Sequence, residues 1–90
     1  MKEIILVGAE YCAACKAMKA WFFNTSLKGV TLLYEDLESE AVMGEKITSL
    51  PAIIFRESGE KIQILYGAMT EHDLIKKTGG LWPDTQSEEE

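Results

Sequence analysis

The chain has 90 residues, two cysteines and a formal net charge of −6 at pH 7. This length indicates one domain, and two cysteines are too few for the disulfide framework of a small secreted protein. The negative charge argues against a nucleic-acid binder, which normally carries a basic patch. The apolar run at residues 4–7 is too short to span a membrane, and no secretory leader pattern precedes it. We therefore expect a cytoplasmic protein in a reducing compartment.

The first part of the chain predicts two strands joined by a helix. Residues 2–8 form a nearly continuous apolar run, which is typical of a strand buried on both faces in the middle of a sheet. Helix-forming residues follow from Ala13 to about Asn24, with apolar side chains at helical spacing. Residues 30–34 are rich in β-formers. We expect them to form a second strand parallel to the first, with the helix as a right-handed crossover.

The middle of the chain predicts a further helix and a hairpin. Residues 38–47 favour a helix more weakly, because Gly44 interrupts them at a cost of about 1 kcal/mol relative to alanine. A short apolar strand at 52–55, a polar turn and an alternating pattern at 62–66 then predict a β-hairpin.

The last predicted helix has the clearest ends. Thr70 is its expected N-cap, Asp73 stands three residues on, and Gly79 lies just beyond its last turn. The sequence therefore predicts an α/β fold in the order β-α-β-α-β-β-α, with a four-stranded mixed sheet flanked by three helices. We place the domain at residues 1–82 and expect the acidic tail at 83–90 to be disordered.

Cys12 and Cys15 form a C-x-x-C pair where the first strand gives way to the helix. If Cys12 lies in the first turn, the positive end of the helix dipole favours its thiolate, which is the nucleophilic form. Cys15 then lies on the same helix face, within reach of a disulfide. A redox pair, half of a metal site and two small core residues remain alternatives. A zinc site needs four ligands, and only His72 is a further candidate, so we expect no metal.

A second motif is Leu50-Pro51, directly before a buried strand. Proline lacks the N–H that a sheet needs, so it suits the first residue of a strand. With this motif the sequence resembles the thioredoxin superfamily, in the small form shared with glutaredoxins. The resemblance covers residues 2–80, and the segment 9–16 is similar to the thioredoxin active-site segment. Leu50-Pro51 matches the cis-proline motif of the family.

The resemblance implies a dithiol–disulfide oxidoreductase that reduces protein disulfides without a cofactor. It implies that Cys12 is the exposed nucleophile and Cys15 the buried resolving thiol. It allows ribonucleotide reductase as a substrate and either a thioredoxin reductase or glutathione as electron source, and we expect a monomer. The residues implied to form the substrate groove are Tyr11, Leu50, Pro51, Gly67 and Ala68.

Two departures from the family pattern keep alternatives open. Thioredoxins place a buried aspartate six residues before the nucleophilic cysteine, where it assists proton transfer, and that position here is Leu6. We consider Glu10 and Glu35 as replacements. Residues 66–69 lack the Gly-Gly and acidic pair with which glutaredoxins hold glutathione. The alternatives are a glutathione-dependent glutaredoxin, a thioredoxin-fold binding module with an idle dithiol, and a dimeric iron–sulfur or zinc carrier.

Overall fold

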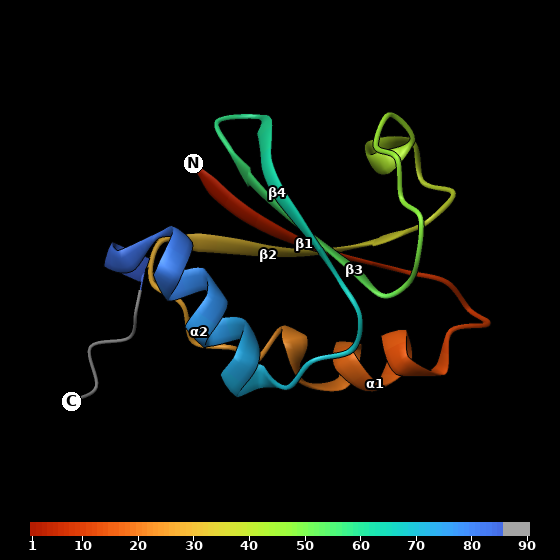
Figure 1. The fold of residues 1–90 in the computed structure, drawn as a ribbon, viewed down its shortest axis with the longest axis horizontal. Coiled ribbons are helices and arrows are strands. Elements are labelled where there is room, and N and C mark those ends of the chain that lie inside the picture. The colour runs from red at the N-terminus through yellow and green to blue at the C-terminus, as the bar shows by residue number, and fades with distance from the viewer. Residues whose placement is uncertain (86–90) are drawn as a thin grey trace.

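The computed structural model of the chain describes residues 1–85, and residues 86–90 of the predicted tail lie outside that range. Four strands and two α-helices are seen in the described residues (Figure 1). In chain order they are β1 (Lys2–Gly8), α1 (Ala13–Phe22), β2 (Val30–Asp36), β3 (Ala52–Glu57), β4 (Glu60–Tyr66) and α2 (Glu71–Leu81). Two short 3₁₀ turns accompany them, η1 (Glu40–Val42) and η2 (Pro83–Thr85).

The four strands form one mixed sheet in the order β2-β1-β3-β4. β1 and β2 are parallel, whereas β3 is antiparallel to β1 and β4 is antiparallel to β3. β1 therefore lies inside the sheet, as its continuous apolar pattern predicts, and α1 is the crossover that leads to β2. The predicted α/β class, the mixed four-stranded sheet and the hairpin are confirmed.

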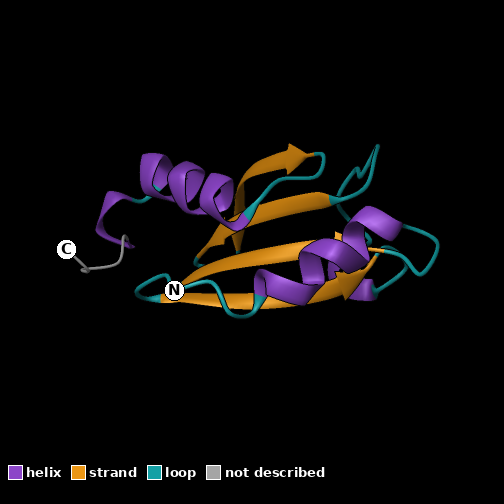
Figure 2. Cartoon of the chain, turned by 90° about the horizontal axis from the view of Figure 1, so that it is seen from below, coloured by secondary structure: helices purple, strands orange, loops and turns teal. Residues whose placement is uncertain are grey.

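Both α-helices cover the same face of the sheet (Figures 1 and 2). Successive residues of a strand point to opposite faces, so Ile4 and Leu6 of β1 meet the helices while Ile5 and Val7 point away. The helix-covered face forms one core with Met18, Phe22 and Leu74 from the helices, and Ile4, Leu6, Ile53 and Phe55 from the strands. The second core lies on the opposite face, under η1 and the residues around it.

The predicted helix at 38–47 is wrong, because this segment forms only the single turn η1. Its hydrogen bonds link residues three apart, as in Val42 N–H to the Ser39 carbonyl (3.1 Å) and Glu45 N–H to the Val42 carbonyl (3.0 Å). Val42 is almost fully covered, but Met43 is 68% exposed. With no apolar stripe to bury and a glycine at 44, a longer helix gains little from packing. The sheet is therefore flanked by two α-helices rather than three.

The start of α2 agrees with the prediction, but its end does not. The Thr70 hydroxyl accepts a hydrogen bond from the Asp73 N–H (3.1 Å), and the Asp73 carboxylate accepts one from the Thr70 N–H (3.4 Å). This is the predicted capping box. The helix continues through Gly79 to Leu81 rather than ending before Gly79.

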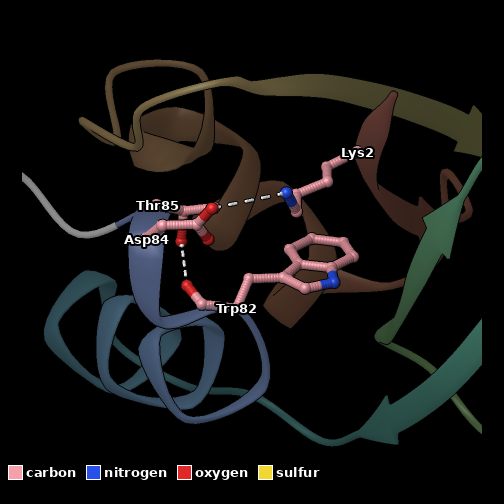
Figure 3. A network of polar contacts seen from close by, with 4 residues as sticks. All are labelled: Lys2, Trp82, Asp84 and Thr85. Carbon is pink, nitrogen blue, oxygen red and sulfur yellow. Dashed lines mark hydrogen bonds and ion pairs between the residues drawn. The ribbon is translucent and has the colours of Figure 1, made fainter.

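The chain after α2 is tied back to the sheet (Figure 3). Trp82 is 5% exposed, and the centre of its ring lies 5.7 Å from the centre of the Phe55 ring. The Thr85 hydroxyl donates to the Trp82 carbonyl (2.7 Å), and the Asp84 carboxylate lies 3.9 Å from the Lys2 ammonium. The first three residues of the predicted disordered tail thus form η2 and belong to the folded domain.

Candidate active site

The two cysteines stand at the N-terminal end of α1. Cys12 is the N-cap residue, with extended backbone angles, and its sulfur accepts a hydrogen bond from the Cys15 N–H at 3.1 Å. The two residues are joined as a disulfide, with their Cα atoms 5.3 Å apart. This separation lies within the range that unstrained backbones provide. Cys15 is fully buried, whereas Cys12 is only partly buried.

A tight turn carries the chain from β1 into the helix. The Cys12 N–H donates to the Ala9 carbonyl (3.0 Å), and the Lys16 N–H donates to the Cys12 carbonyl (3.2 Å) to start the helix. Cys12 consequently lies at the carboxyl end of a central strand and at the positive end of a helix dipole. When the disulfide opens, both the dipole and the unpaired N–H groups of the first turn favour a thiolate at Cys12.

A cavity of about 390 Å³ opens beside Cys12. Tyr11 lies at this site with 79% of its surface exposed. Within the described part of the chain the lining includes no charged residue, and it consists of Tyr11, Cys12, Leu37, Ile47, Thr48, Ser49 and Leu50. The cavity therefore offers apolar and hydroxyl contacts to a group that approaches Cys12.

The structure places the predicted groove residues in two positions. Tyr11 and Leu50 line the cavity together with Cys12. The Leu50-Pro51 bond is cis, and Pro51 is buried at the start of β3. The Gly67 N–H donates to the Pro51 carbonyl (2.9 Å). The φ angle of Gly67 is 102°, a backbone conformation that favours glycine. Gly67 thus lies next to Pro51, and neither Gly67 nor Ala68 lines the cavity.

Leu37 and Ile47 are cavity residues that the sequence pattern did not indicate. Leu37 directly follows β2, and its N–H donates to the Gly8 carbonyl at 2.8 Å, which brings it to the end of β1. The parallel register of β1 and β2, with Gly8 opposite Asp36, places Leu37 there, and the sequence alone does not specify this register. Ile47 lies in the irregular segment after η1, where no periodic pattern indicates the direction of a side chain.

The two glutamates considered as proton carriers lie away from Cys15. Glu10 is exposed in the turn before Cys12. Glu35 pairs with Val7 in the sheet, on the face opposite the α-helices, and its carboxylate accepts a hydrogen bond from the Ser39 hydroxyl at 2.7 Å. Leu6 is fully buried in the core beneath α1. The Cys15 sulfur lies 4.0 Å from the carbonyl oxygen of Val7, and a second polar group approaches it from β2.

That group is the hydroxyl of Tyr34 on β2. A Cβ atom placed on Gly8 would lie 2.5 Å from the Tyr34 hydroxyl oxygen and 3.2 Å from the Cys15 sulfur. The two atoms thus approach the same point, and only glycine leaves that point empty. Burial raises the pKa of Tyr34, and the nearby Asp36 carboxylate raises it further, so the hydroxyl stays protonated at neutral pH.

Metal-ligand clusters and membrane-spanning helices are both absent from the described residues. No group of three or more His, Cys, Asp and Glu side chains within residues 1–85 is arranged to hold a metal ion. No helix in that part of the chain is long and apolar enough to cross a membrane.

Comparison with known proteins relates the chain to thioredoxins through its structure. No known family model matches the sequence, and no curated protein matches it either. Among solved structures, a mutant thioredoxin from Halobacterium salinarum NRC-1 superposes with a TM-score of 0.75 at 15% identity, over 88% of this chain and 73% of that one.

Two structures of Plasmodium falciparum thioredoxin give similar results. One has a TM-score of 0.73 at 24% identity and covers 90% of this chain and 81% of its own. The other has a TM-score of 0.69 at 24% identity, covering 90% and 70%. The chain therefore has the thioredoxin fold, with a C-x-x-C disulfide at the N-terminal end of its first helix.

Proposed function

We propose that the chain is a dithiol–disulfide oxidoreductase that reduces protein disulfides through Cys12 and Cys15. The observation that carries this proposal is the placement of a partly exposed Cys12 as N-cap of α1, beside an open cavity and a fully buried Cys15. A helix N-terminus favours the thiolate that attacks disulfides, and the buried partner is protected from competing reactions.

The reaction follows from the order in which the two sulfurs meet the substrate. The Cys12 thiolate attacks one sulfur of the substrate disulfide, that S–S bond breaks, and the other substrate sulfur leaves as a thiolate. Cys15 then loses its proton, and its sulfur attacks the Cys12 sulfur. The mixed disulfide breaks, and the second substrate sulfur leaves as a thiolate that takes up the proton. Two electrons have passed to the substrate, and the Cys12–Cys15 disulfide remains for an external reductant to open.

The chemistry of the cavity supports a protein substrate rather than glutathione. Glutathione carries two carboxylates and an ammonium group, and buried or bound charges need partners of opposite charge. Among the described residues, none that lines the cavity beside Cys12 is charged. An extended peptide with an apolar residue next to its cysteine has no such need. We accordingly propose thioredoxin reductase as the electron source, with ribonucleotide reductase among the substrates.

We propose that the protein acts as a monomer, because one chain supplies both of the sulfurs that the reaction needs. A cytoplasmic location fits the proposal because a disulfide reductant needs a reducing compartment.

The test is turnover of insulin disulfides with two alternative electron sources. The protein is supplied with NADPH and thioredoxin reductase in one assay, and with glutathione and glutathione reductase in the other. We expect turnover in the first and little in the second, and efficient turnover only with glutathione would favour the glutaredoxin alternative. Cys12→Ser is expected to abolish turnover. If this variant reduced insulin as fast as the unmodified protein, the dithiol would be idle and the fold would act as a binding module.

A further inference from the structure

We propose that the Tyr34 hydroxyl donates a hydrogen bond to the Cys15 thiolate when the mixed disulfide is resolved. This inference rests on the proposed dithiol chemistry and assigns the group that acts at the resolving thiol. In this chain Leu6 offers no polar atom there, and neither Glu10 nor Glu35 reaches the site.

The sheet register places Tyr34 next to Cys15. Tyr34 pairs with Leu6 across the parallel strands, and Gly8 lies two residues further along the same face of β1. Cys15 reaches that face from α1. Because Gly8 has no side chain, the end of the tyrosine ring and the cysteine sulfur share the space above it. The hydroxyl oxygen and the sulfur lie 2.5 and 3.2 Å from the point that a Cβ on Gly8 would take.

The groups around Tyr34 keep its ring in place and its hydroxyl protonated. The Lys19 ammonium of α1 lies 4.2 Å from the centre of the ring, at a distance suited to a cation–π contact. Burial and Asp36, on the same strand, both raise the pKa of Tyr34. A neutral phenol can donate a hydrogen bond, whereas a phenolate would repel the thiolate. Charge and burial therefore favour the donor form at the pH where disulfides are exchanged.

Tyr34 also differs from Cys15 in its access to water. Cys15 is fully buried, while Tyr34 is only partly buried. During resolution the proton lost by Cys15 ends on the departing substrate thiolate, so that protons and charge balance. Tyr34 stays neutral throughout, and its O–H turns toward the sulfur as negative charge develops there. The hydroxyl thus replaces hydration that the buried sulfur cannot obtain directly.

Tyr34→Phe tests the proposal, because it removes only the hydroxyl. The titration of Cys15 is followed in a Cys12→Ser background through the chemical shift of the Cys15 Cβ atom, which does not depend on reagent access. A hydrogen bond to a charged group implies that Tyr34→Phe raises the titration midpoint by about one pH unit. At neutral pH the thiolate fraction then falls roughly tenfold, but the remaining thiolate is about threefold more nucleophilic. Release of substrate from the mixed disulfide should slow by about threefold.

Tyr66→Phe is the matched control, because the Tyr66 hydroxyl donates to the Lys46 carbonyl (3.1 Å). This variant should leave the Cys15 midpoint unchanged. An unchanged midpoint in Tyr34→Phe would overturn the proposal, whatever the turnover. A raised midpoint in a protein that fails to reduce insulin would instead support the contact while refuting the proposed function. Formation of the mixed disulfide by Cys12 should be equally fast in both variants, and a slower first step in Tyr34→Phe would contradict a role limited to Cys15.

Discussion

Gly8→Ala should destabilise the folded protein, because the space above Gly8 is already filled by two side chains. The added Cβ would lie 2.5 Å from the Tyr34 hydroxyl oxygen and 2.8 Å from the Cys15 Cβ. Carbon atoms in contact normally stay about 3.5–4.0 Å apart. The tyrosine hydroxyl ends a side chain and can rotate outward, but the Cys15 Cβ is fixed to the backbone of α1. The helix itself must therefore move by several tenths of an ångström.

Overpacking of this kind costs about 1–3 kcal/mol. For a domain of this size, a loss of about 2 kcal/mol corresponds to a fall in Tm of roughly 8–16 °C. Urea and thermal unfolding of the oxidised protein measure both quantities. Combining Gly8→Ala with Tyr34→Phe should recover part of the loss, since the double variant removes the hydroxyl oxygen that crowds the added Cβ most closely.

Gly80→Ala is the control for Gly8→Ala. Apart from its chain neighbours and the nearby backbone of its own helix, no atom of the described residues lies within 4 Å of a Cβ added at Gly80. The residue belongs to α2, so alanine should stabilise the protein by about 0.5–1 kcal/mol. If Gly8→Ala proved as stable as the unmodified protein, Tyr34 and Cys15 would not share the space that the Tyr34 proposal needs.

Three further predictions concern stability. Thr70→Ala removes the hydroxyl that accepts the Asp73 N–H and should cost about 1 kcal/mol in urea unfolding, and no loss would show that the cap is unimportant. Trp82→Ala leaves a cavity beside Phe55 and should cost about 3–5 kcal/mol, whereas a loss under about 1 kcal/mol would contradict its buried position. Because the pKa of Tyr34 is raised in the folded state, its contribution to stability is complete below about pH 10 and is lost as pH rises further. Tyr34→Phe should therefore lose less stability in alkali, and parallel stability–pH curves for the two proteins would refute this.

Local signals in the sequence were sufficient for much of the fold. The continuous apolar run predicted that β1 lies inside the sheet, and the alternating pattern after the polar turn predicted the hairpin. The Thr70 capping box marked the start of α2, because cap and partner are only three residues apart. In each case the interaction that fixes the element lies within a few residues of it.

The errors arose where distant contacts decide the structure. Residues 38–47 have a weak helical pattern, but they form only the turn η1. The sheet face opposite the α-helices buries Val42 of this turn and leaves Met43 exposed. The helix α2 continues through Gly79 to Leu81, and Trp82 then packs on Phe55 of the sheet. Intrinsic helix propensity does not include the energy of this packing, so Gly79 was predicted to end the helix.

In the candidate site, too, the features fixed by nearby residues could be predicted, and those fixed by distant contacts could not. Cys12 and Cys15 are three residues apart, so their position on the helix could be predicted from the sequence. Tyr34 and Leu37 reach the site only through the parallel register of β2 with β1, which a single sequence does not specify. The approach of the Tyr34 hydroxyl and the Cys15 sulfur to one point further depends on the absence of a side chain at Gly8. Glycine is common where strands end in turns, so its presence at position 8 did not by itself predict that two side chains meet above it.

The central claim is that Cys12 attacks the substrate and Cys15 resolves the mixed disulfide. The most direct measurement is the intact mass of each single-cysteine variant after reaction with a protein disulfide. Cys15→Ser should form a stable covalent adduct through Cys12, because the resolving thiol is missing. Cys12→Ser should form little or none, because Cys15 is fully buried. Equal adducts on both variants, or none on Cys15→Ser, would contradict the assigned roles.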